Sequence, residues 1–472
     1  VDNPNTEAIE GRILYNTDWQ DAIYRTAISF DHSLSARGSV FKTVPIRLSL
    51  GYTESQGLVK TSNYERITSS MKLTPRFLDD HLKVDLNAKG IMSRKNAIDE
   101  GGALGGAVNM DPTKPIFDDS PDNRFGGYYQ NTVLDGDFVR LDGQWNPVAI
   151  LMQRYRPEEV QKILANVELD YKMHFLPELR AVANVGIEAS KAKVRETYLD
   201  NSLATYKQDD TATDPANNYR FNPGVNYREN QDIVNRTLET YLAYEKDFDG
   251  PIRSFDVQAG YSYQNFKNDG NKEEYRYNDD TGIRELIIDP QNPTNRYYNE
   301  LNLQSYFGRT NVNFFDKYLL TVSFRADASS LFSKENRWGY FPAAALAWKV
   351  KEESFLKDVD VVNNLKLRLG WGRTGQQDIT GAVGFYPSIP LFEAGSATSQ
   401  YLAGYALFSA RPYNSDLTWE KAETYNAGLD FGLLQGNRIS GSFDVFYRTT
   451  KDLLATVPVA PGQALTSSFV KN

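Results

Sequence analysis

The residue types that carry most enzyme and metal chemistry are sparse in this chain of 472 residues. There are no cysteines, so no disulfide framework, thiolate metal site or cysteine nucleophile can form. The three histidines are His32, His81 and His174, and they are scattered along the sequence. Metal sites and catalytic triads need clustered side chains, so we predict no metal, no cofactor and no histidine-based catalysis.

Acidic side chains gather at 118–122, 209–214 and 279–280. Calcium prefers several hard oxygen ligands, but none of these clusters has EF-hand spacing, and we interpret them as solvated loop. The glycine-rich stretch at 100–108, EGGALGGAV, lacks the lysine of a phosphate loop. We predict a loop or a close backbone approach there, without a phosphate role.

Aromatic and amide side chains in the predicted loops are the best candidates for binding chemistry. Tyr and Trp beside Asn and Gln suit sugar faces and hydroxyl groups, and they also suit peptides. Packing of loop against loop is the alternative for each residue. The set is Tyr128, Tyr129, Gln130, Trp145, Tyr155, Tyr297, Tyr298, Tyr401 and Tyr405. From it we select Tyr128, Tyr129, Trp145 and Tyr155 as candidate ligand contacts.

The elements that must position these residues alternate apolar and polar side chains with a period of two. In Leu319–Ala328, for example, Leu320, Val322 and Phe324 lie on one face of the predicted strand, and the residues between them lie on the other face. Read this way, the chain contains about fourteen strands and little helical spacing. The fold class is therefore all-β.

The breaks between predicted strands alternate in length. Short breaks are expected at Phe41–Thr43, Phe77–His81, Leu176–Glu178, Asp249–Pro251, Asp316–Lys317 and Gln435–Asn437. Long breaks lie near 54–59, 94–161, 196–231, 268–300, 329–337 and 375–418. A transmembrane antiparallel β-barrel with short periplasmic turns and long extracellular loops has this asymmetry, whereas a β-sandwich has no reason for it. Aromatic residues beside the short turns would form a girdle at one membrane interface.

The width of such a barrel predicts the direction of its two faces. About fourteen strands enclose a lumen too wide for side chains to fill, so polar residues face a wet lumen and apolar residues face lipid. We predict that Arg325, Asp327, Arg368 and Asp444 face the lumen. The net charge of −9 argues against a nucleic-acid partner.

Five segments resemble the SusC/RagA family of TonB-linked outer-membrane transporters. NTDWQDAIYRTA at Asn16–Ala27 is similar to the segment that opens that family's barrel. The segment Ala326–Leu356 resembles the characteristic strand–loop–strand block of that family. Three further segments are similar to the later barrel strands of the family: Leu365–Ile379, Leu417–Leu434 and Phe443–Leu454. These segments occur in the family's order across nearly the whole chain.

The resemblance implies an outer-membrane barrel of about 22 strands that imports large nutrients in a Bacteroidetes-type Gram-negative cell. It further implies a SusD-like lipoprotein lid and energy from an inner-membrane TonB–ExbB–ExbD complex acting through a plug. Oligosaccharides are the expected substrates, with peptides as the alternative. A dimer of importer–lid pairs is also implied.

The resemblance divides the chain into a plug-to-barrel lead-in at residues 1–22 and a partial barrel at 23–472. The family's plug domain, TonB box and last strands are expected to be absent from these residues. Two rivals stay open: a glycan-active enzyme with a large β fold, which needs two converging carboxylates, and a surface adhesin.

Overall fold

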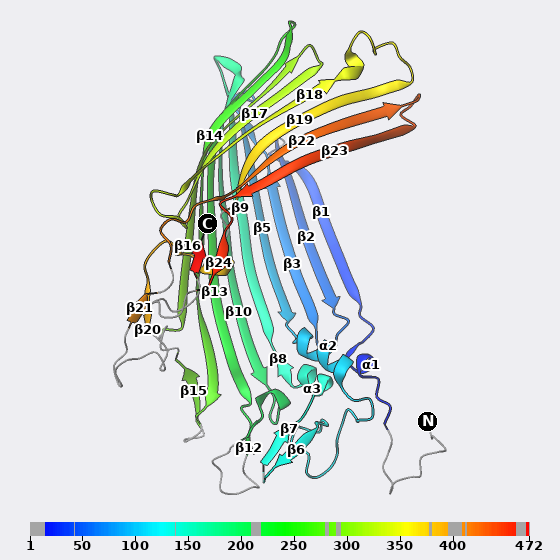
Figure 1. Ribbon diagram of the computed structural model, residues 1–472, viewed down its shortest axis with the longest axis vertical. Helices are drawn as coiled ribbons and strands as arrows, with labels where there is room; N and C mark the ends of the chain where they lie inside the picture. The colour runs from blue at the N-terminus through cyan, green and yellow to red at the C-terminus, as the bar shows by residue number, and fades with distance from the viewer. Residues whose placement is uncertain are drawn as a thin grey trace.

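The computed structural model describes residues 15–41, 43–136, 138–208, 219–278, 283–288, 294–376, 380–394, 408–410, 413–458 and 469–471. Among these residues, fourteen long strands of 11–26 residues form one curved sheet (Figure 1). They are β1 (Ser29–Val40), β2 (Val44–Gln56), β3 (Asn63–Leu73), β5 (Leu82–Asn96), β9 (Pro157–Met173), β10 (Leu176–Tyr198), β13 (Gly224–Asp247), β14 (Ile252–Tyr277), β16 (Arg296–Phe314), β17 (Tyr318–Ser329), β18 (Trp338–Lys349), β19 (Val362–Gln376), β22 (Glu420–Leu433) and β23 (Ile439–Lys451). The predicted strand number is confirmed.

Each long strand pairs antiparallel with the next long strand along the chain. Within the described residues, β1 and β23 are each paired along one edge. Short strands β4 (Arg76–Phe77), β8 (Arg154–Tyr155) and β15 (Arg284–Ile287) add to β5, β10 and β14. In the part of the chain that the structure describes, four small two-stranded sheets lie outside this sheet: β6 (Thr132–Asp135) with β7 (Phe138–Leu141), β11 (Lys207–Gln208) with β12 (Tyr219–Arg220), β20 (Phe392–Ala394) with β21 (Phe408–Ala410), and β24 (Ala455–Val457) with β25 (Phe469–Lys471).

The connections alternate between short and long, as predicted. One difference concerns the turn between β9 and β10, which lies at His174–Phe175 and not at Leu176–Glu178. A register shift between Leu176 and Arg180 explains the difference, because a bulge absorbs the residues that looked like a turn. We call the end of the sheet where the short connections lie the short-turn end, and the opposite end the long-connection end.

The sheet has an apolar face and a polar face. On β17, Val322 and Phe324 are 45% and 49% exposed on the apolar face, while Arg325 and Asp327 occupy the polar face with Ser323. Cross-strand pairing continues the apolar face from Leu320 to Val312 on β16 and to Leu346 on β18. Among the described residues, no helix is long and apolar enough to cross a membrane.

Two groups of aromatic residues bound the apolar face. Beside the short turns, exposed rings include Phe77, Phe175, Phe248, Phe315 and Tyr318. A second group, not anticipated from the sequence, consists of exposed tyrosines nearer the long connections: Tyr263, Tyr306, Tyr340, Tyr425 and Tyr447. On β17, the step from Tyr318 to Ala326, which pairs with Tyr306 and Tyr340, is about 27 Å at ~3.4 Å per residue. This spacing matches the apolar band of an outer-membrane barrel, about 25 Å tall.

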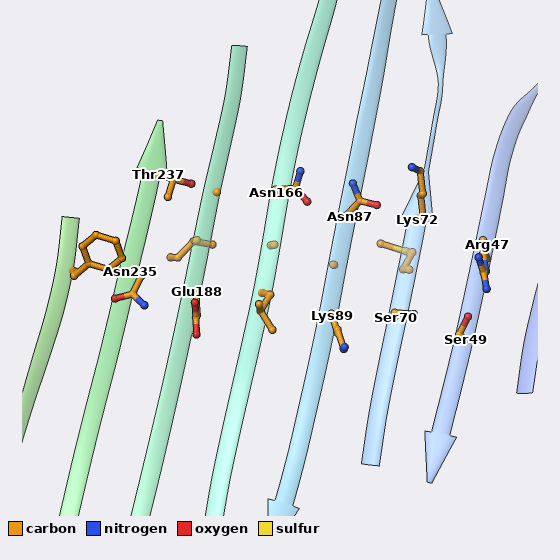
Figure 2. Close-up of a pocket in the computed structure, with 17 residues that line it drawn as sticks. Arg47, Ser49, Ser70, Lys72, Asn87, Lys89, Asn166, Glu188, Asn235 and Thr237 are labelled. Carbon is orange, nitrogen blue, oxygen red and sulfur yellow. The ribbon is translucent and has the colours of Figure 1, made fainter. Parts of the chain in front are cut away.

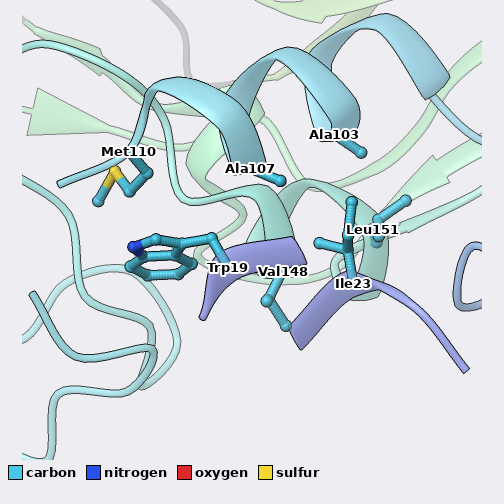
Figure 3. Close-up of a cluster of buried hydrophobic side chains, with 7 residues drawn as sticks. All are labelled: Trp19, Ile23, Ala103, Ala107, Met110, Val148 and Leu151. Atoms are coloured by element: carbon cyan, nitrogen blue, oxygen red, sulfur yellow. The ribbon is translucent and has the colours of Figure 1, made fainter. Parts of the chain in front are cut away.

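The buried core lies at the long-connection end. Helices α1 (Trp19–Ile23), α2 (Glu100–Asn109) and α3 (Pro147–Met152) pack there beside η1 (Leu203–Thr205), as Figure 1 shows. Short helices α4 (Thr380–Val383) and η3 (Val350–Glu352) occur in other connections. Figure 3 shows the main cluster: Trp19, Ile23, Ala103, Ala107, Met110, Val148 and Leu151.

The loop predicted for EGGALGGAV is wrong, because this stretch forms α2, whereas the alternative prediction of a close backbone approach is confirmed at Gly106. Asp99 caps the helix by accepting the Gly102 N–H at 3.0 Å. A Cβ at Gly106 would lie 3.0 Å from Pro147 Cβ and 3.2 Å from Trp145 O. Close packing against α3 therefore outweighs the low helix propensity of glycine.

Candidate functional site on the polar face

A hollow of about 630 Å³ lies on the polar face, midway along β2 to β14 (Figure 2). Cross-strand pairing builds it as two adjacent rows. The first row is Arg47, Lys72, Asn87, Asn166, Gly186 and Thr237. The second is Ser49, Ser70, Lys89, Leu164, Glu188, Asn235 and Phe266. The rows offer hydrogen-bond donors and acceptors to a polar molecule.

The charge on this hollow is divided between its two sides. Arg47, Lys72 and Lys89 come from β2, β3 and β5, whereas Glu188 comes from β10 and forms an ion pair with Lys162. Gly186 leaves space for Thr237 within the first row, since a Cβ there would lie 2.5 Å from Thr237 Oγ1. The surface therefore suits reversible, directional binding.

A second polar region crosses the same face nearer the long connections. Lys95 Nζ lies 2.8 Å from Glu158, and Arg156 lies within 3.8 Å of both Glu158 and Glu196. Arg154 Nε donates to Glu196 at 3.0 Å. The buried Arg154 Nη1 has no hydrogen-bond acceptor among the described residues. One buried guanidinium nitrogen is thus without an acceptor in this network of ion pairs.

The network continues onto β13, β14 and β16. The Arg156 guanidinium lies 5.6 Å from the centre of the Tyr227 ring. Glu229 accepts hydrogen bonds from Tyr227 and Tyr297 at 2.6 and 2.9 Å, with Lys272 Nζ at 4.0 Å. Burial, and then the hydrogen bond to Glu229, raise the pKa of both tyrosines, so both hydroxyls stay protonated donors. Tyr297 and Glu229 line a hollow of about 900 Å³ outside the apolar band.

The four residues predicted to face the lumen all lie on the polar face. Arg325 pairs with Asp327 at 2.7 Å and donates to Ser305 at 2.8 Å. Arg368 bridges Asp430 and Asp444 at 2.8 and 3.0 Å.

Gly428 makes the Arg368 bridge possible. A Cβ there would lie 2.5 Å from Asp444 Oδ1 and 2.7 Å from Arg368 Nη2. The structure thus joins the four residues into two separate ion-pair groups.

The four candidate ligand contacts, Tyr128, Tyr129, Trp145 and Tyr155, do not form a single group. Tyr128 and Tyr129 are half-buried and pack against the cluster of Figure 3, and burial raises the pKa of Tyr128. Trp145 and Tyr155 are 39% and 47% exposed. The Tyr155 hydroxyl accepts from Arg94 at 2.9 Å.

The buried side-chain amide of Asn146 holds the segment around Trp145 in place. Asn146 is fully buried; its Nδ2 donates to Ile116 O and Tyr129 O at 2.9 Å. Its Oδ1 accepts from the α3 backbone at Val148 and Ala149. Sequence reasoning missed Asn146, although an Asn directly before Pro at a helix start is a detectable capping signal.

The acidic cluster at 118–122 is explained by local hydrogen bonds. Asp118 accepts from the Ser120 N–H at 3.0 Å and from Asn123 Nδ2 at 3.3 Å. The clusters at 209–214 and 279–280 lie outside the described residues, as do Tyr401 and Tyr405.

Comparison with known proteins identifies the family. The family model "TonB dependent receptor-like, beta-barrel" matches residues 111–472, and the chain belongs to this family. TonB-dependent receptor SusC of Bacteroides thetaiotaomicron is 39% identical over 97% of this chain and 44% of its own length. TonB-dependent receptor P3 of Formosa agariphila is 29% identical over 97% of this chain and 43% of its own length.

The solved structures show the same fold. A structure of the RagAB peptide transporter superposes with a TM-score of 0.74 at 20% identity, covering 96% of this chain and 48% of that one. The chain thus spans less than half the length of each of these relatives. The expected resemblance to the SusC/RagA family is confirmed, and it places the chain in a Bacteroidetes-type outer membrane.

Proposed function

We propose that this chain is the wall of an outer-membrane importer of large nutrients, with oligosaccharides as the first substrate class. The observation that supports this best is the two-faced sheet. Its apolar face carries a lipid-sized band between two groups of aromatic rings, and its polar face carries continuous hydrogen-bonding rows. A wall with these faces separates lipid from a wet passage.

Import would proceed by reversible binding and release, so we propose that the protein is not an enzyme. The hollow of Figure 2 and the Glu229 network would form successive polar contacts along the passage. Residues 1–22 would lead into the partial barrel at 23–472. A plug elsewhere in the longer protein would couple transport to the TonB–ExbB–ExbD complex.

A SusD-like surface lipoprotein would close the long-connection end as a lid, in a dimer of importer–lid pairs. Trp145 and Tyr155 are the exposed contacts proposed for ligand or lid, and Tyr128 and Tyr129 add half-buried rings beside them. Arg325, Asp327, Arg368 and Asp444 would face the lumen.

Peptide import is the second candidate, because the chain shares the fold of the RagAB peptide transporter. A strain lacking the full-length gene should be grown on panels of oligosaccharides and of peptides, each as the limiting nutrient. Loss of growth on one glycan, restored by the wild-type gene, supports the first candidate. Loss confined to peptides supports the second.

Two outcomes would overturn importer function. Unimpaired growth of the deletion strain on every nutrient would favour an adhesin. Full-length protein in the aqueous fraction without detergent would contradict a membrane wall. Within the assay, Trp145→Ala tests the loop contact, and Leu134→Ala, at a 75% exposed site on β6, is the matched control.

A further inference from the structure

An arginine without an acidic partner lies on the apolar face of β13, beside the outer group of tyrosines. Tyr263 of that group pairs with Leu238, and the next pair on the same face joins Asn265 to Arg236. Arg236 is exposed, and its guanidinium forms no hydrogen bond or ion pair with any residue that the structure describes. On the other side it pairs with Ile187 of β10, which is 43% exposed. A charge at the edge of lipid costs free energy unless a polar or anionic group meets it.

Lys267 provides a second cation beside Arg236. It pairs with Val234, the next residue of β13 on the same face, so Lys267 and Arg236 are diagonal neighbours. Diagonal positions on adjacent strands are about 7–8 Å apart, within reach of two long side chains. The Lys267 ammonium lies 4.9 Å from the centre of the Tyr298 ring. Both cations can therefore turn toward one anion.

Two acidic side chains at neighbouring positions on this face have cationic partners of their own. Asp232 lies 3.8 Å from Lys191, and Asp269 lies 2.7 Å from Arg296. Neither carboxylate forms an ion pair with Arg236 among the described residues. The charge of this arginine is thus not balanced by the acids around it.

Glu300 pairs directly with Lys267 across β14 and β16, yet other donors occupy its carboxylate. The Tyr298 hydroxyl donates to it at 2.7 Å, and Asn265 Nδ2 donates to it at 2.6 Å. Asn265 is only 8% exposed, and its amide also donates to Asn302 at 2.8 Å. This buried amide fixes the carboxylate without an ion pair to Lys267 within the described part of the chain. Two positive charges are left over at the membrane edge.

We propose that Arg236 and Lys267 bind the phosphate monoester of a membrane lipid whose acyl chains lie on the apolar face. Aromatic girdles mark the level of lipid headgroups. A guanidinium binds phosphate oxygens in pairs, and an ammonium adds a compact charge. The two cations match a phosphate monoester, which carries a charge of about −1.5 to −2 near neutral pH. Nearer the short-turn end, Val185 pairs with Leu238, and these side chains offer an apolar surface to the acyl chains.

This site rests on the membrane wall of the proposed function, but it lies on the face opposite to the passage. Asn235 and Thr237 flank Arg236 along β13, and both line the hollow of Figure 2 on the polar face. Successive residues of a strand point to opposite faces, so Arg236 points away from that hollow. A bound lipid would hold the wall at a fixed height in the membrane without entering the passage.

The test uses full-length protein in detergent, titrated separately with dioleoylphosphatidic acid and dioleoylphosphatidylcholine and followed by native mass spectrometry. We expect one tightly held phosphatidic acid per chain and weaker binding of phosphatidylcholine, whose phosphate is a diester beside a cationic choline. Arg236→Gln and Lys267→Gln should each weaken phosphatidic acid binding about fivefold, and the double variant about 25-fold. Arg236→Lys keeps the charge and should retain more binding than Arg236→Gln.

Arg228 supplies the matched control. It is exposed on the same face of β13, about 27 Å farther along the strand from the apolar band at ~3.4 Å per residue. Arg228→Gln should therefore bind phosphatidic acid as the wild type does.

Three results would overturn the lipid site. They are equal binding of the two lipids by the wild type, unchanged phosphatidic acid binding in the Arg236→Gln/Lys267→Gln variant, and displacement of the lipid by an equal concentration of inorganic phosphate. Each of these would leave the membrane wall intact. Full-length protein in the aqueous fraction without detergent would instead remove both the wall and this site.

Discussion

Two groups of five neighbouring strands in the sheet are built to different heights. The tall wall consists of β9, β10, β13, β14 and β16, with 17–26 residues each. The short wall consists of β17, β18, β19, β22 and β23, with 12–15 residues each. At ~3.4 Å per residue, β14 is about 88 Å long and β17 about 41 Å. The short wall is little more than a membrane crossing, whereas the tall wall continues far beyond it (Figure 1).

This difference teaches that lipid and water stabilise different parts of one sheet. In the short wall, the apolar face meets lipid along most of each strand. In the outer part of the tall wall, water lies beside the strands, and polar side chains must hold them together. The Arg154–Glu196 pair and the two tyrosine hydrogen bonds to Glu229 do this.

The largest contrast is expected from one substitution at two equally exposed leucines. Leu346 on β18 is 41% exposed within the apolar band, and Leu286 on β15 is 40% exposed outside it. Leu346→Arg should cost about 1–3 kcal/mol of folding free energy, because it places a charge in lipid between the interface and the midplane. Leu286→Arg should change it by less than about 0.5 kcal/mol, because that arginine stays in water.

Urea-induced unfolding of the full-length protein in lipid vesicles measures both leucine variants. Equal destabilisation by the two substitutions would mean that the apolar band extends as far as β15. The tall wall would then have no wet outer part, and the distinction between the two walls would be lost.

Two glycines test how tightly each wall is packed. A Cβ at Gly260 on β14 would lie 2.4 Å from the backbone oxygen of Thr240, which cannot move freely. At Gly428 on β22, the obstructing atoms are the ends of Asp444 and Arg368, which can turn aside. Overpacking costs about 1–3 kcal/mol, and we expect Gly260→Ala near the upper value and Gly428→Ala near the lower. The same unfolding measurement checks this order, and a reversed order would contradict it.

The strand segments inside the apolar band were the part most readily predicted from sequence. Leu320, Val322 and Phe324 alternate with polar residues because one face meets lipid, so period two is visible there. Beyond the band both faces are wet and the contrast disappears. The predicted break at 268–300 therefore overlooked the end of β14 at Tyr277 and the start of β16 at Arg296.

Features that depend on register between distant segments could not be predicted at all. The stacking of His81 on His174 requires a particular register between β5 and β9 across a long connection, and no local pattern reports that register. The Arg325–Asp327 pair was accessible, since both residues share one face of one strand. Helix α2 was missed because its glycines are favourable only when α3 is packed against them.

A smaller contrast is expected from removing one tyrosine hydroxyl in each wall. Tyr297, which is half-buried, donates to Glu229 at 2.9 Å, whereas Tyr425, which is 50% exposed, donates to Glu423 at 3.1 Å. Tyr297→Phe should cost about 1.5 kcal/mol, because the hydrogen bond to a carboxylate is partly shielded from water. Tyr425→Phe should cost less than about 0.5 kcal/mol. Thermal unfolding in detergent compares them, and a larger loss in Tyr425→Phe would contradict the role of Glu229 in the tall wall.

The smallest effect concerns Glu353, in the connection between β18 and β19 at the short-turn end of the short wall. Hydrogen bonds from Lys317, Tyr318 and Trp348 hold its pKa at about 2, below the ordinary 4.5. The ionised carboxylate therefore stabilises the fold above pH 4.5, and this contribution is lost as the pH falls toward 2. Glu353→Gln should lower the unfolding temperature at pH 7 and flatten its decline between pH 4.5 and 2, whereas Glu352→Gln, at the exposed neighbouring site, should leave the profile unchanged. Identical profiles for wild type and Glu353→Gln would show that the short wall needs no polar support at its turns, and that lipid contact alone sustains it.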